Sequence, residues 1–149
     1  MKKSTPNSFI LFLILLLTPV IALFAQNTES ASPLKKIDSL LSVLKTAKED
    51  TVAVNNLNEL ARLYLRTGDY KLSLQKAELS FKQSEKLAYK KGIASSISIM
   101  GLVEWNKGNN EGALRNFFKA LKIREEIGDK KGLANCNNYL GLVYWNQGN

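Results

Sequence analysis

Hydrophobic residues recur along most of this chain at helical spacing, and short polar turns separate the runs. The first run covers residues 34–50, and its apolar positions fall on one face of a helix: Ile37, Leu40, Leu41 and Leu44. Residues 51–67 continue the spacing and end at Gly68, a residue that readily adopts the positive φ found after a helix. A second helix is expected from about residue 70 to residue 88, with Asp69 as its N-cap. The pattern therefore predicts antiparallel helix hairpins.

The predicted hairpin is repeated after forty residues. Residues 101–109 read GLVEWNKGN, and residues 141–149 read GLVYWNQGN. A recurrence at a fixed offset indicates tandem units, each of which buries its apolar face on the next. The predicted array has these parts in order: a lead-in capping helix (34–50), a first unit (51–90), a second unit (91–130) and a partial third unit (131–149).

The third unit ends after its first helix and turn, at Gly148 and Asn149. Without a second helix to cover it, this first helix would expose the apolar side chains of Leu140, Val143 and Tyr144. We therefore expect the array to be truncated in mid-repeat. A longer protein would continue past residue 149, and any catalytic or membrane segment would lie there.

The first residues have the composition of a secretory signal peptide. Two lysines precede the apolar run 9–17, and Ala25 precedes a polar residue at the expected cleavage point. An uncleaved membrane anchor is the alternative, although the run 9–25 is shorter than the roughly 20 residues that span a bilayer. Residues 26–33 are small and polar, as in a linker. We expect residues 1–25 to direct export, so that the remainder is periplasmic or membrane-associated on the extracytoplasmic side.

Composition removes several classes of function. The formal charge is +8, with 45% hydrophobic and 23% charged residues, as in a folded domain. Because the chain has no histidine and only one cysteine, Cys136, it can form no Ser-His-Asp or Cys-His site and no internal disulfide. Basic residues opposite the apolar stripe, such as Lys119 and Lys122, are explained by a solvated helix face rather than by nucleic acid. We expect no catalytic, cofactor or metal site in these residues.

Small and aromatic residues recur at fixed places in the units. The first helices carry a small residue, followed three positions later by Tyr64 or Tyr144 in two units, and a second helix carries small residues around an aromatic one. These positions are Ala61, Gly101 and Gly141, then Ala113, Phe117 and Ala120. Over residues 51–149 the pattern resembles the tetratricopeptide repeat, with a period of 40 rather than 34 and without the usual tryptophan and proline. The resemblance implies a right-handed α-solenoid, and long-period arrays of this kind are similar to those in bacterial signalling proteins.

The resemblance also implies that the first helix of each unit lines a concave binding groove. Asn and Ser side chains there can donate and accept hydrogen bonds along an extended peptide, and tryptophan adds contact area at low entropic cost. The candidate groove residues are Asn55, Asn58, Arg62, Arg66, Ser95, Ser98, Leu102, Trp105, Asn135, Asn138, Leu142 and Trp145. Two alternatives stay open: the tryptophans pack between units, or the Asn and Ser positions only keep an exposed face soluble.

These patterns favour recognition over catalysis. We expect a scaffold that binds a protein or an extended peptide, as the extracytoplasmic sensory region of a larger signalling protein of the histidine kinase type. A stand-alone secreted or envelope-assembly scaffold and the N-terminal part of a nucleotide cyclase are the alternatives. The chain itself is not expected to be an enzyme or to bind nucleic acid. It would meet a membrane only through an uncleaved leader or a segment past residue 149.

Overall fold

The computed structural model describes residues 32–148. The predicted signal peptide (1–25) and residues 26–31 of the predicted linker (26–33) therefore lie outside the described residues. The chain divides into two units, Met1–Lys36 and Ile37–Asn149, and most of the described residues belong to the second. The described part contains six helices and no strand: α2 (Pro33–Thr46), α3 (Thr51–Arg66), α4 (Tyr70–Lys86), α5 (Lys90–Asn106), α6 (Asn110–Glu126) and α7 (Lys130–Asn146).

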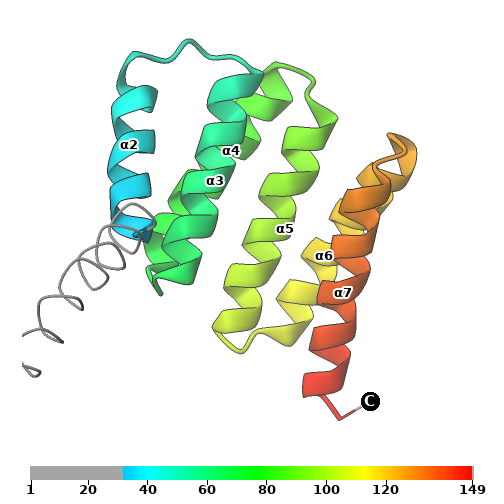
Figure 1. The fold of residues 1–149 in the computed structure, drawn as a ribbon. Helices are drawn as coiled ribbons and strands as arrows, with labels where there is room; N and C mark the ends of the chain where they lie inside the picture. The colour runs from blue at the N-terminus through cyan, green and yellow to red at the C-terminus, as the bar shows by residue number, and fades with distance from the viewer. Residues whose placement is uncertain (1–31, 149) are drawn as a thin grey trace, which may run out of the picture. The chain divides into compact units, whose positions relative to one another are not determined.

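From α3 onward the helices form two layers of antiparallel hairpins. Helices α3, α5 and α7 lie in the front layer of Figure 1, and α4 and α6 lie behind them. Helix α4 packs against both α3 and α5, and α6 packs against both α5 and α7, so each rear helix joins two units. Helices α4 and α6 begin forty residues apart, as do α5 and α7. The predicted all-α repeat array of helix hairpins is confirmed over the described residues.

Acidic and amide side chains begin most of these helices. Asp50, Asp69, Asn109 and Asp129 each accept a hydrogen bond from the backbone N–H three residues later, at 2.9–3.0 Å. This contact satisfies one of the amide groups that have no partner in the first turn of a helix. Among the helices from α3 onward, α5 is the exception, because its N-cap residue, Tyr89, makes no side-chain capping bond.

Most of the turns depend on a residue with positive φ. Gly68, Gly108, Gly128 and Gly148 follow α3, α5, α6 and α7, with φ between 65° and 83°. After α4 the same place holds Ala88, with φ of 49°. An L-residue pays a steric penalty in this region that glycine does not, so the α4–α5 turn is the strained member of the set.

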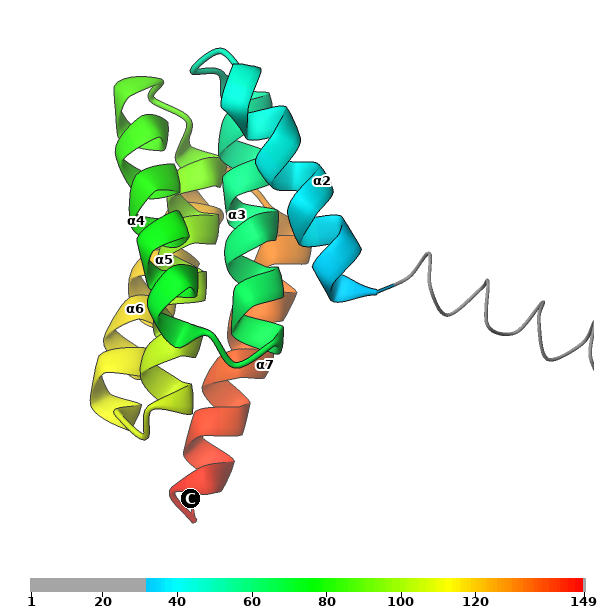
Figure 2. The ribbon, with the colours of Figure 1, turned by 90° about the vertical axis from the view of Figure 1, so that its left-hand side faces the viewer.

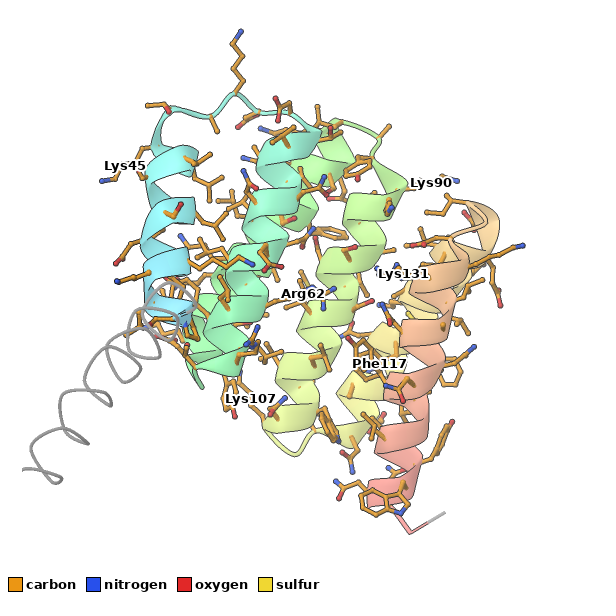
Figure 3. The ribbon with its side chains drawn as sticks, in the orientation of Figure 1. Lys45, Arg62, Lys90, Lys107, Phe117 and Lys131 are labelled. Atoms are coloured by element: carbon orange, nitrogen blue, oxygen red, sulfur yellow. The ribbon has the colours of Figure 1, made fainter. Side chains whose placement is uncertain are left out.

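Close contact between helices explains the small residue at Gly101. A Cβ atom added at Gly101 would lie 2.7 Å and 2.9 Å from ring carbons of Phe117, which is completely buried. The glycine therefore lets α5 approach α6 closely enough for the aromatic ring to fill the space beside it. Figure 3 shows Phe117 where α5, α6 and α7 meet. It packs there with Leu102, Ala113, Leu140 and Val143 in one hydrophobic cluster. The expectation that Leu140 and Val143 would be exposed is therefore wrong, because both pack in this cluster, whereas Tyr144 is 39% exposed.

Helix α2 covers the outer side of α3, where the sequence predicts a lead-in helix. Its residue Ile37 is buried with Leu60 and Leu63 of α3, and Leu40, Leu41 and Leu44 pack around them. These four apolar residues of α2 are the helical stripe seen in the sequence. Figure 2 shows α2 inclined across α3, with α4 on the other side.

Candidate functional site

The twelve candidate groove residues all lie on the three helices of the front layer, but they differ in exposure. Six are exposed: Asn55, Arg66, Asn135, Asn138, Leu142 and Trp145. Three are half-buried: Arg62, Ser95 and Trp105. The remaining three, Asn58, Ser98 and Leu102, are buried. The first nine can contact a ligand in this structure, and the last three belong to the interior.

Asn58 belongs to a polar network between α3, α4 and α5. Its Oδ1 accepts a hydrogen bond from Ser96 Oγ at 3.0 Å, and Ser96 Oγ lies 3.1 Å from Ser80 Oγ. Ser80 in turn donates to the carbonyl oxygen of Val54. The network lets small polar residues pack closely without leaving most of their polar atoms unpaired. Asn58 therefore helps to join two units.

Ser98 and Leu102 are also held by neighbouring helices. Ser98 donates to the carbonyl oxygen of Ala94 within its own helix, and its Oγ lies 3.8 Å from the sulfur of Cys136 on α7. Leu102 packs in the cluster around Phe117. Both residues are covered because α5 has helices on several sides, whereas α3 and α7 lie nearer to the ends of the described array. Cys136 is completely buried, as expected for a packing residue.

The two tryptophans occupy equivalent positions and have different surroundings. Trp105 is half-buried and packs against the cluster formed by Leu102, Phe117 and their neighbours. Trp145 is 78% exposed. Packing between units therefore accounts for Trp105, while Trp145 presents a large apolar surface to solvent, as a contact residue for a partner would.

Two arginines give the front layer a positive site. Arg62 and Arg66 lie one helical turn apart on α3, and neither forms an ion pair with any residue that the structure describes. Figure 3 shows Arg62 between α3 and α5. Two guanidinium groups at this spacing can hold a carboxylate through charge-assisted hydrogen bonds.

Amide side chains supply the remaining polar groups of the face. Asn55 accepts a hydrogen bond from the hydroxyl of Tyr89 at 3.3 Å. Asn135 and Asn138 have no side-chain hydrogen bond within the described part of the chain, so both keep a donor and an acceptor available. Because Asn55, Ser95 and Asn135 are forty residues apart, they occupy the same place on three successive front helices.

One polar feature of the structure was not predicted from the sequence. Arg124, at the end of α6, donates to Asp129 Oδ2 at 2.6 Å, and the two side chains are only 6% and 14% exposed. The pKa of Asp129 is lowered, first by the hydrogen bond from the Gly132 N–H and then by the Arg124 guanidinium, while burial opposes the shift. The sequence signal that could have indicated this ion pair is a departure from the repeat, because the equivalent residues forty positions earlier are Ser84 and Tyr89.

The ion pair fixes the junction between α6 and α7. A Cβ atom at Gly132 would overlap the Arg124 guanidinium and the Asp129 carboxylate, so a side chain there would displace the pair. The pair therefore holds the junction, and the second terminal nitrogen of Arg124, Nη2, lies 3.5 Å from Ser95 Oγ on the front helix α5.

Neither metal chemistry nor a membrane span is indicated in the part of the chain that can be described. Within residues 32–148 there is no group of three or more His, Cys, Asp or Glu residues arranged to hold a metal ion. Over the same range no helix combines the length and the hydropathy of a transmembrane segment. Comparison with protein-family models and with curated proteins gives no match to this chain.

Proposed function

We propose that this chain is a scaffold that binds a protein or an extended peptide on the exposed face of α3, α5 and α7. The supporting observation is the recurrence of ligand-accessible groups in one layer at the forty-residue period. Asn55, Ser95 and Asn135 repeat one polar position, and Trp145 adds an exposed aromatic surface. Repeated positions of this kind suit a ligand whose own groups recur along an extended backbone.

A free carboxylate is the feature of the partner that this face recognises best. Arg62 and Arg66 provide positive charge at one end of the layer, and Leu142 and Trp145 provide apolar contacts at the other. The partner is therefore an extended segment with an acidic group and an apolar or aromatic group. The nine accessible candidates supply these contacts, and the three buried ones keep the helices in place.

The cellular setting is part of the proposal. The basic, apolar and small residues of the first 25 positions support export. The resemblance of the forty-residue repeat to long-period arrays in bacterial signalling proteins supports a sensory region of a larger protein of the histidine kinase type. Fusing the chain to a reporter enzyme that is active only outside the cytoplasm tests export. An inactive reporter fused to a stably expressed chain would contradict it.

An array of immobilised peptides of varied charge and apolar content tests recognition. We expect acidic, apolar peptides to bind the chain best. Trp145→Ala, and separately the double change Arg62→Gln and Arg66→Gln, should lower their affinity about tenfold or more. The matched control is Lys119→Gln with Lys122→Gln, both on exposed positions of the rear helix α6. If the control lowers affinity as much as the front changes do, the face has been assigned to the wrong layer.

A further inference from the structure

A hollow of about 570 Å³ lies at the outer end of the array, between α2, the loop after it, α3 and α4. Its size falls within the range of roughly 300–1,000 Å³ that is typical of small-molecule sites. Figure 2 looks onto this end of the molecule and shows α2 and α4 on either side of α3. Ala53 and Leu57 of α3 are among the lining residues, and both are buried.

The repeat explains why this hollow exists. Forty residues after Ala53, the next unit has Ile93, and both Ile93 and Phe81 of the preceding hairpin pack against the buried cluster that contains Ile97. In the first unit the smaller alanine stands in that place, and α2 directs its apolar stripe at Leu60 and Leu63 instead. The space that isoleucine and phenylalanine fill between the later units is therefore open at this end.

The lining is apolar with a positive rim. Leu41, Leu44 and Leu57 line the hollow together with Leu79, which is 42% exposed on α4. Lys45, Lys48 and Lys76 also line it, and none of them forms an ion pair with any described residue. Of the two acidic lining residues, Asp38 and Glu49, the second is paired with Lys86 at 3.4 Å. The lysines therefore leave positive charge available beside an apolar wall.

One polar atom at the hollow lacks a partner. Gln83 lines it, and Oε1 of Gln83 is buried without a hydrogen bond to any described residue. An unpaired buried acceptor is unfavourable, and a rotation of the partly exposed Gln83 side chain toward the hollow would let a ligand N–H satisfy it.

We propose that this hollow binds a small anionic amphiphile that contains an amide, such as an N-acyl amino acid. The acyl chain lies against the leucines, the carboxylate meets the lysines, and the amide N–H donates to Gln83. This site is separate from the proposed peptide face, because its residues lie on α2, α4 and the outer side of α3.

The probe is N-dodecanoylglycine, and its binding is measured by titration calorimetry below its micelle concentration. We expect a single site, with affinity about tenfold higher than for the methyl ester, which lacks the charge, and for dodecanoate, which lacks the amide. The absence of binding, or equal affinity for the acid and its ester, would overturn the proposal. So would equal affinity for the acyl amino acid and dodecanoate.

Variants locate the site. Ala53→Ile gives the first unit the residue of the second and should lower affinity about tenfold or more. If circular dichroism shows that this variant is unfolded, Leu79→Ser, at an exposed position of the wall, takes its place. Gln83→Leu should remove only the preference for the acyl amino acid over dodecanoate. Lys122→Gln on α6 is the control, and binding that responds to it as strongly as to the pocket variants contradicts the assignment.

Discussion

Helices α5 and α7 carry almost the same sequence in their C-terminal halves, yet they are held in the molecule in different ways. In α5, Gly101 touches the buried ring of Phe117, and Trp105 is half-buried. In α7 a Cβ atom at Gly141 would meet nothing within 4 Å, and Trp145 is exposed. The shared motif therefore specifies a helix and its turn, while the neighbouring helices decide which of its residues are buried.

The polar contacts at the N-terminal junctions of α5 and α7 differ in the opposite direction from the burial of these helices. Helix α7 begins with the Asp129 cap and the buried ion pair to Arg124. Helix α5 begins after Ala88 in a left-handed conformation, and Tyr89 gives it no side-chain cap. The less covered helix is thus the one that has the stronger polar junction.

The largest expected effect comes from breaking that junction. Asp129→Ala removes the cap on Gly132 and leaves the Arg124 guanidinium buried without its carboxylate, so we expect it to lower the free energy of unfolding by about 3 kcal/mol. Urea unfolding followed by circular dichroism measures the change. Tyr89→Phe removes the polar group at the equivalent position of the other junction and should stay within about 0.5 kcal/mol of the parent. Equal losses in the two variants would show that the junctions do not differ.

The comparison also shows which features the sequence could predict. Helices, turns and caps depend on local signals, so Gly68 and Asp69 predict the end of α3 and the start of α4 from the sequence alone. The helices that carry the candidate face, α3, α5 and α7, could be predicted because the repeat fixes the order of first and second helices in each unit. Burial of Asn58, Ser98 and Leu102 could not be predicted, because exposure on a helix depends on how many neighbours cover it. The hollow at α2 likewise depends on the inclination of that helix, which no periodicity encodes.

Acid should weaken the α6–α7 junction selectively. The pKa of Asp129 is lowered in the folded chain, so its carboxylate adds stability at pH values above its ordinary pKa of 3.8. That contribution is lost as the pH falls through the lowered folded value. We expect the difference in unfolding free energy between the parent and Asp129→Asn to be largest near neutral pH and to narrow below 3.8. A difference that stays constant with pH would mean that the ionised carboxylate does not stabilise the junction.

Alanine at the two equivalent glycines should change stability in opposite directions. Gly101→Ala places a methyl group against the ring of Phe117, and we expect a loss of about 1–3 kcal/mol. Gly141→Ala meets open space, so the better helix propensity of alanine should raise stability by up to about 1 kcal/mol. The same urea titrations measure both. A loss of similar size at Gly141 would show that another part of the protein covers this face of α7.

The smallest effect is expected at the two turns that differ between the junctions. Ala88 has a φ of 49°, where glycine is favoured, so Ala88→Gly should raise the free energy of unfolding by somewhat less than 1 kcal/mol. Gly128→Ala makes the reverse change at the equivalent turn, where φ is 65° and no atom lies within 4 Å of the new Cβ, and should cost about 1 kcal/mol. Changes of opposite sign in the free energy of unfolding would show that the backbone conformation of the turn causes the effect. If both changes are neutral, the difference between the junctions lies entirely in the cap and the ion pair of Asp129.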